Sequence, residues 1–334
     1  MDDTHSSPVE SADDQTPDPY APIRGEVRLA GFRRVSHGLY MRTRDDTDEH
    51  TEFVRDLQGW LLVLPPGAAF THVTGARLRG WKLPQLPEQV PIFAAIRGDI
   101  SRPRRPGLIC SRLVHPSTRG ECHGLPVDSA EEILLRACRD LGVLDVVIML
   151  DAARRAGDLD DRRMEELIAT RRPGVRQLRR AYELSDALAE SAGETVLRLF
   201  HRMCDVTVQP QVDLHDGSGA FLGRADLLVT GTHLVHEYDG AGHRDGGQHR
   251  SDLRRERALA GAGYDRRGFT LDDLLNKPTT VMHEIDRALD RRHDQRRIRR
   301  WRALVDDSLY AEAGRERVMN RWRRQASIDW SATA

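Results

Sequence analysis

The spacing of apolar residues divides the chain into stretches that predict strands and helices. In "FRRVSHGLYMR" apolar positions flank a Ser-His-Gly turn, which indicates short strands and turns within residues 25–50. Helices are predicted over residues 52–64 and 71–80. The apolar runs "QVPIFAAIRG" and "GLICSRLV" are typical of buried strands. The first part of the chain is therefore expected to be mixed α+β.

A clearer helix is predicted to begin at Ser129. Ser129-Ala-Glu-Glu132 has the spacing of a capping box, in which each side chain accepts a hydrogen bond from the other residue's amide. Gly142 ends this helix, and a second helix is expected over residues 143–156. Two more are expected within residues 171–203, with breaks near 173–174 and 185–191. The apolar stripe of the first helix consists of Ile133, Leu134, Ala137, Cys138 and Leu141.

The apolar period changes after these helices. Strands are predicted in "VTVQPQVDLHD", "AFLGRADLLV" and "HLVHEYD". A helix capped by Ser251 and ended by Gly263 follows, and then a short strand "RRGFT", the segment "LDDLL" and one long Arg-rich helix. From about residue 188 the order is helix, three strands, helix, strand, helix, which indicates a compact α/β domain with an αβββαβ core.

Three carboxylates lie close together in the second and third predicted strands of this domain. If Gly231-Thr232 forms a two-residue type II′ loop, counting outward along both strands sets Asp226 opposite Glu237. Asp239 follows two residues later and projects from the same face of its strand. Three carboxylates are thus predicted to converge on one surface of a hairpin.

Like charges that face each other destabilise a sheet unless a positive group lies among them. A hard divalent cation such as Mg²⁺ removes this cost, since it binds one or two carboxylates together with the oxygens of a substrate phosphate. Such a metal can activate water and stabilise charge on a phosphate in transfer. One alternative is a different strand register, and the other is neutralisation by arginine. The arginines available for the latter are Arg224, Arg254, Arg255 and Arg267.

The motifs of this domain resemble a branch of the PD-(D/E)xK restriction-endonuclease-like fold, namely domains related to very-short-patch mismatch-repair endonucleases. Over about residues 188–290, "RADLLV", "LVHEYDGAGH" and "DLRRERALAGAGYDRRGFT" follow the patterns R-x-D, E-x-D-G-x-x-H and D-x-x-R-D/E-x-x-L. "AESAGETVLR" is similar to the first helix of that family, with Glu194 as its acidic residue. The other matching positions are Arg224, Asp226, Glu237, Asp239, Gly240, His243, Asp252, Arg255, Glu256 and Leu259.

This resemblance implies a Mg²⁺- or Mn²⁺-dependent DNA endonuclease. Asp239 stands where the motif has Lys, and because the mismatch-repair relatives use a His instead, His243 is the natural substitute. By strand alternation His236 points away from the carboxylates. The implied site consists of Asp226, Glu237 and Asp239 at the metal, Glu194 as an assisting carboxylate and His243 as the acid–base group.

The region before this domain resembles the core of AbiEi-type proteins, the antitoxins of type IV toxin–antitoxin systems. The resemblance rests on "FRRVSHGLYMR", "GAAFTHVTGARLRGWKLP" and "GLPVDSAEEILLRACRDLGVLDVVIMLDAARRAGDL". That family often begins with a DNA-binding winged helix, of which only the wing-like "RRVSHGLY" is found here. The resemblance implies a role in phage defence or beside a cognate toxin. A catalytically inactive DNA-binding or antitoxin-like transcriptional regulator is the alternative function.

Charge is distributed unevenly along a chain whose net charge is −1. Residues 1–23 contain six acidic residues, four prolines and no Lys or Arg, a composition typical of a disordered tail. We therefore expect four parts: a disordered acidic tail at 1–23, an AbiEi-like region with a degenerate winged-helix start at 24–180, a PD-(D/E)xK-like domain at 181–290, and Arg-rich helices at 291–334.

Arg-Trp-Arg occurs twice in the Arg-rich segment, which makes DNA a predicted partner. Arginine can bind phosphates bidentately and tryptophan can stack on bases. In the alternative interpretation these are solvated helices whose tryptophans pack on the domain. The residues expected to contact DNA are Arg255, Arg297, Arg300 and Arg321.

The four cysteines show no CxxC spacing, so reduced thiols in a cytoplasmic protein are expected rather than a zinc site or a disulfide framework. The N-terminus lacks the basic and apolar regions of a signal peptide. The longest apolar runs are too short to span a bilayer, so no membrane contact is expected.

Overall fold

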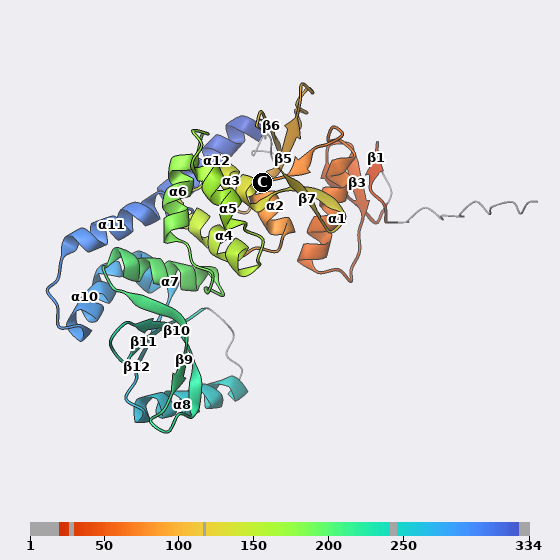
Figure 1. Cartoon of the computed structure of the whole chain (residues 1–334). Helices are drawn as coiled ribbons and strands as arrows, with labels where there is room; N and C mark the ends of the chain where they lie inside the picture. Colours follow the sequence, from red (N-terminus) through yellow and green to blue (C-terminus); the bar gives the residue numbers. More distant parts are fainter. Residues whose placement is uncertain (1–19, 27–29, 116–117, 241–245, 327–334) are drawn as a thin grey trace, which may run out of the picture. The chain divides into compact units, whose positions relative to one another are not determined.

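The computed structural model describes residues 20–26, 30–115, 118–240 and 246–326, except for the side chains of residues 246–253 (Figure 1). The chain forms two compact units, one ending at Leu64 and the other starting at Pro65. Both contain helices and sheets, which confirms the predicted mixed α/β fold class. The expected boundary between residues 180 and 181 lies inside the second unit. Most of the predicted acidic tail, residues 1–19, lies outside the described residues.

The first unit consists of a small antiparallel sheet and one helix. Asp48 caps the helix, because its carboxylate accepts hydrogen bonds from the amides of His50 and Thr51. The helix therefore begins at Glu49 rather than at Glu52 as predicted. The elements are β1 (Ile23–Arg24), β2 (Phe32–Ser36), β3 (Leu39–Arg42) and α1 (Glu49–Leu61), with strand order β1-β3-β2.

The second unit starts with a five-stranded sheet, and both strands predicted in this region are present. Helix α2 (His72–Leu78) follows the first strand of the sheet and packs against Ile133 through Gly75. The strands are β4 (Ala69–Phe70), β5 (Ile92–Arg97), β6 (Leu108–Leu113), β7 (Arg119–Cys122) and β8 (Leu125–Asp128), in the order β6-β5-β4-β8-β7. Strand β6 is thus an edge strand.

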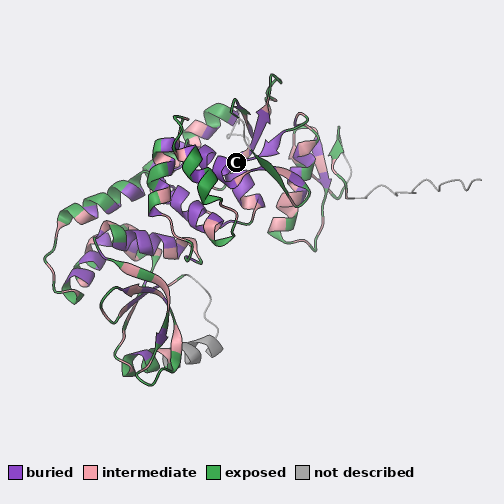
Figure 2. Ribbon diagram, viewed as in Figure 1, coloured by how far each residue is buried: buried purple, intermediate pink, exposed green. Residues whose placement is uncertain are grey.

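Four helices follow, and the second of them is central to the core. They are α3 (Ala130–Ala137), α4 (Val143–Arg155), α5 (Asp161–Ile168) and α6 (Val175–Leu184). Every residue from 141 to 151 is buried, so α4 is covered on all sides (Figure 2). The predicted capping box at Ser129 is wrong. Ser129 makes no side-chain cap, and Glu132 instead forms a bidentate pair with Arg172 at 2.5 and 2.7 Å.

A four-stranded sheet carries the predicted αβββαβ order. Its elements are α7 (Ala192–Met203), β9 (Val208–His215), β10 (Phe221–Val229), β11 (Leu234–Tyr238), α8 (Gly246–Gly261) and β12 (Asp265–Phe269). The strand order is β12-β11-β10-β9, and α7 and α8 cover opposite faces (Figure 1). Helix α8 begins at Gly246, so the start predicted at Ser251 is wrong.

A single long Arg-rich helix is wrong, because the segment after β12 folds into separate helices, of which the last two lie within the Arg-rich segment 291–334. These are the short α9 (Leu271–Asn276), then α10 (Pro278–Ala288), α11 (Gln295–Asp306) and α12 (Glu312–Ala326). Asp290 has a φ of 47°, which ends α10, and Asp294 caps α11 by accepting from the amide of Arg296. Trp301 and Trp322 are fully buried.

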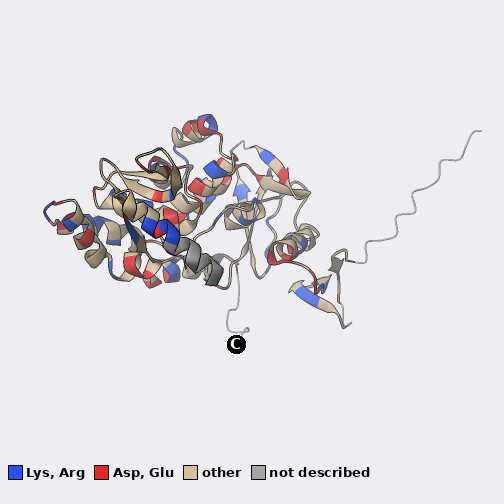
Figure 3. Cartoon of the chain, turned by 90° about the horizontal axis from the view of Figure 1, so that it is seen from below, with Lys and Arg blue, Asp and Glu red and all other residues tan. Residues whose placement is uncertain are grey.

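Basic and acidic residues are interspersed along the helices (Figure 3). Many are ion-paired, as with Arg172 and Glu132, or Arg198 and Asp151. None of the helices among the described residues combines the length and the apolar character that crossing a lipid bilayer requires.

Candidate functional site

The hairpin of β10 and β11 has the predicted register. Leu227 pairs with His236 and Leu228 with Val235, so the next position sets Asp226 opposite Glu237. The predicted turn type is wrong, however. The amide of Thr232 donates to the carbonyl of Val229 at 3.1 Å, which places Gly231, with a φ of 77°, at the second central position rather than the first. The change of turn type does not alter the register, because the same residues of β10 and β11 still pair.

Asp226 is half-buried between the strands. Its Oδ2 accepts a hydrogen bond from the backbone amide of Tyr238 at 2.8 Å, which fixes the carboxylate beside β11. The pKa of Asp226 is raised to about 6, mainly by burial and further by the charges of Glu194 and Glu237, although the Tyr238 amide and Arg255 act to lower it. Asp226 of β10 therefore lies within electrostatic reach of Glu194 on α7 and of Glu237 on β11.

Glu194 reaches this cluster from the first turn of α7. Ser191 caps the helix by accepting from the amide of Glu194, and Glu194 Oε2 accepts from Gln211 Nε2 at 2.8 Å. The register of β9 and β10 pairs residue 212 with 225 and residue 210 with 227, so Gln211 lies opposite Asp226. Gln211 thus binds Glu194 from the strand position opposite Asp226.

Gln211 has a φ of 52°, in the left-handed region, and sequence reasoning missed it. Polar residues occupy alternate positions of β9 at 209, 211 and 213, a pattern that predicts a plain solvent-facing side of a strand. The unusual backbone conformation that turns Gln211 toward Glu194 has no counterpart in that pattern.

Arginines neutralise Glu237, whose exposed fraction is only 6%. Its Oε1 accepts from Arg255 Nη2 at 2.7 Å, and its Oε2 accepts from Arg266 Nε at 2.6 Å. Arg255 was among the four arginines considered from the sequence, whereas Arg266 was not. Two of the others pair elsewhere: Arg224 with Asp213, and Arg267 with Asp265.

The carboxylate of Asp239 lies beside β12. Its carboxylate lies over Gly268, where a Cβ atom would collide with it, and an oxygen is 3.8 Å from Arg266 Nη2. The structure therefore brings together Glu194, Asp226 and Glu237. Asp239 lies at the edge of this group.

His236 points away from the carboxylates, as predicted. It is buried under α7, with its Nδ1 2.7 Å from His201 Nε2. Burial lowers the pKa of His201 to about 4 and that of His236 to about 2, so both rings are neutral near pH 7. His243, the expected acid–base residue, lies outside the described residues.

The four arginines expected to contact DNA all make internal ion pairs. Arg255 pairs with Glu237, and Arg300 with Asp205 at 2.6 Å. Arg297 pairs with Asp205 and Asp286, and Arg321 pairs with Asp140 at 2.5 Å. The two tryptophans of the Arg-Trp-Arg motifs are core residues, as in the packing alternative.

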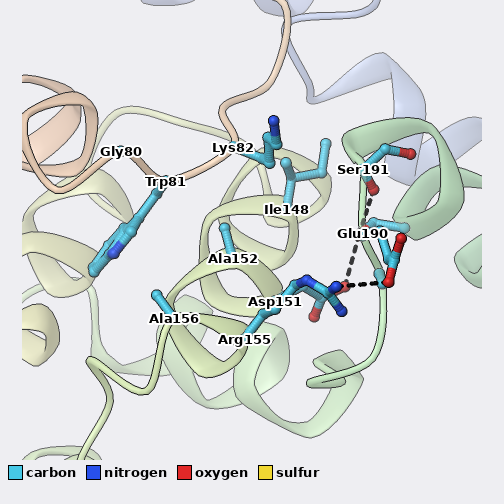
Figure 4. A pocket seen from close by; sticks show the side chains of 12 residues that line it. Gly80, Trp81, Lys82, Ile148, Asp151, Ala152, Arg155, Ala156, Glu190 and Ser191 are labelled. Atoms are coloured by element: carbon cyan, nitrogen blue, oxygen red, sulfur yellow. Dashed lines mark hydrogen bonds and ion pairs between the residues drawn. The ribbon is translucent and has the colours of Figure 1, made fainter.

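A cavity of about 170 Å³ is lined by Glu190, Ser191 and Thr195 at the start of α7 (Figure 4). Trp81 and Lys82 line one side of it, and the start of α7 lines another. Its charges largely satisfy one another, since Arg155 pairs with Glu190 at 2.6 Å and Asp151 with Arg198 at 2.7 Å. Within the described part of the chain, no three His, Cys, Asp or Glu side chains are grouped so as to hold a metal ion.

Replacing Glu237 with glutamine is expected to destabilise the second unit by about 2–3 kcal/mol, because Arg255 and Arg266 lose their carboxylate. The expected loss of stability is smaller than for a fully buried ion pair, because the side chains of Arg255 and Arg266 are 32% and 27% exposed. Urea unfolding measures it, with Asp213→Asn as a control at an exposed pair. A stabilised Glu237→Gln variant would mean that carboxylate repulsion outweighs the arginine pairs.

Comparison of the chain with protein-family models, with curated proteins and with solved structures gives no match, so the geometry described above is the basis for a functional conclusion.

Proposed function

We propose that the αβββαβ domain hydrolyses DNA phosphodiester bonds with the help of Mg²⁺ or Mn²⁺. The observation that carries this proposal is the convergence of Glu194, Asp226 and Glu237 from three different elements. Carboxylate oxygens are the ligands that these hard cations prefer, and Mg²⁺ needs only one or two of them besides water and phosphate.

Asp226 and Glu194 are the residues that would hold the cation. Each uses one carboxylate oxygen for positioning: Asp226 Oδ2 binds the Tyr238 amide, and Glu194 Oε2 binds Gln211 and the Glu190 amide. The other oxygens, Asp226 Oδ1 and Glu194 Oε1, accept no hydrogen bond among the described residues, so a ligand could use them. A bound divalent cation supplies an activated water and stabilises charge on the phosphate.

Arg255 fits a role in substrate binding. Its guanidinium lies at the carboxylate cluster and is about one-third exposed, and arginine binds phosphate bidentately. A DNA phosphate would then replace Glu237 as its partner. The roles of His243 as the acid–base group and of Asp239 as a metal ligand stay predictions.

A second candidate is a DNA-binding or antitoxin-like regulator that does not cleave its target. The arginines at both oxygens of Glu237 favour it, because they neutralise this carboxylate without a metal. In this candidate the domain serves as a scaffold and the cluster is purely structural.

Nicking of supercoiled plasmid in Mg²⁺ or Mn²⁺ separates the two candidates. Wild type is expected to convert plasmid to the nicked form, and Asp226→Asn to do so at least about a hundredfold more slowly. Asp213→Asn, at an exposed carboxylate of β9, is the matched control and should cut like wild type. Wild type that binds duplex DNA yet never nicks it would leave the regulator as the function.

A further inference from the structure

A cavity of about 650 Å³ beside β6 is rich in arginine. Its position is far from the carboxylate cluster in sequence, and no Asp or Glu side chain is among the described residues that line it. The arginines are Arg102, Arg104, Arg105, Arg112 and Arg324.

Most arginines of this cavity have no strong carboxylate partner among the described residues. Arg112 pairs with Asp99 at 3.2 Å, but Asp99 is fully exposed, so the pair contributes little. Among the described residues, Arg102, Arg104 and Arg324 make no ion pair with a carboxylate. Like charges gathered at one cavity repel one another, and an anion that enters it removes this repulsion.

The walls of the cavity are held in place by packed elements. Leu108, Cys110 and Arg112 alternate along the edge strand β6 and line it, while Ile109 and Ser111 line a small cavity on the other face. Helix α12 contacts β6 and contributes Arg324 at its last turn.

Asp140 anchors this end of α12. It accepts from Trp322 Nε1 at 3.1 Å and pairs with Arg321 at 2.5 Å and with His72 Nε2 at 3.2 Å. The Trp322 ring contacts Phe93 of β5, with ring centroids 5.4 Å apart. Arg324 is therefore presented over β6 by a rigid support, which lowers the entropy cost of binding a ligand.

We propose that this cavity binds a compact molecule with several linked phosphate groups, such as inorganic polyphosphate or a nucleoside polyphosphate. Its volume is within the range of small-molecule sites. Arginine is the side chain best suited to phosphate oxygens, and none of the described residues that line the cavity is aromatic, so we expect the phosphates to carry the recognition. Burial raises the pKa of the Cys110 thiol in the wall of the cavity to about 11, so this side chain adds no negative charge that would oppose a bound phosphate.

Calorimetric titration of the full-length protein with inorganic tripolyphosphate, in a chelating buffer that removes divalent cations, tests this proposal separately from the nuclease. Wild type is expected to bind saturably, and Arg102→Glu with Arg104→Glu to bind at least tenfold more weakly. Both residues are exposed, so the fold should persist, which circular dichroism checks. The matched control reverses two exposed arginines of α6, Arg176→Glu with Arg180→Glu, and should bind like wild type.

Competition identifies the source of the phosphates. Displacement of tripolyphosphate by ATP supports a nucleoside polyphosphate, and failure of ATP to displace it supports inorganic polyphosphate. The proposal is overturned if wild type gives no saturable heat at about 1 mM tripolyphosphate. It is also overturned if both double variants weaken binding equally. A parallel titration with a single-stranded oligonucleotide provides a further check, and binding of the oligonucleotide but not of tripolyphosphate would overturn the proposal as well.

Discussion

Substitution of Trp301 by alanine is expected to lower the free energy of unfolding of the second unit by about 3–5 kcal/mol. The indole is fully buried, its Nε1 donates to the Leu274 carbonyl at 2.7 Å, and its ring contacts Phe200 with centroids 5.3 Å apart. The substitution leaves a large cavity between α11 and α7 and an unpaired buried carbonyl. Chemical denaturation monitored by circular dichroism measures the loss.

The neighbouring Arg299→Ala is the control for Trp301→Ala, since Arg299 is exposed on the same helix and should change stability by less than about 0.5 kcal/mol. Equal effects of the two substitutions would contradict a core role for Trp301.

The burial of these tryptophans also affects how DNA binding should be tested. Deleting the Arg-rich segment removes two core tryptophans, so a loss of DNA binding after deletion would report unfolding. Single charge substitutions in α11 are the appropriate probe.

Acidification from pH 7 to pH 5 is expected to cost about 3–4 kcal/mol of stability through the buried pair of His201 and His236. Their folded-state pKa values, about 4 and about 2, lie below the ordinary value of 6.5. The unfolded chain therefore takes up two protons as the pH falls through 6.5, while the folded protein does not. Stability from this pair is fully present above pH 6.5 and is lost below it.

Other groups around the pair shape this pH dependence. Burial is the main cause for both rings; beyond it, the Leu197 carbonyl raises the pKa of His201 and Arg291 lowers it, while His201 and Arg267 lower that of His236. Buried carboxyls such as Asp145, with a pKa of about 7, act in the opposite direction. The measurement is thus the difference in pH slope between wild type and His201→Phe with His236→Leu. Parallel slopes would show that the pair does not stay neutral.

The sequence predicted the order of elements and the hairpin register well, because both depend on local patterns. Alternation along β10 and β11 set Asp226 opposite Glu237 even though the turn conformation at Gly231 was wrong. A local sequence pattern was less informative where a residue far away in the sequence offers a competing contact. Glu132 has the spacing of a capping box, but Arg172, 40 residues later, offers a stronger charged partner.

The partners of the site residues could not be predicted in the same way. Arg255 and Arg266 come to Glu237 from α8 and β12, and nothing in their local sequence separates them from Arg224 or Arg267. Gln211 depends on a left-handed backbone conformation in mid-strand, which residue alternation does not reveal. Side-chain pairing over long sequence separations is settled only by the packed fold.

The anchoring of α12 has a consequence for synthesis of the chain on the ribosome. Trp322 donates a hydrogen bond to Asp140, which precedes it by 182 residues, and its ring contacts Phe93, which lies earlier still in the sequence. This part of the core cannot be completed until the last helix has been translated, so the nascent chain carries an uncovered apolar surface in the meantime. A nonsense or frameshift mutation ahead of residue 322 should therefore yield an insoluble or rapidly degraded product rather than a shortened active one.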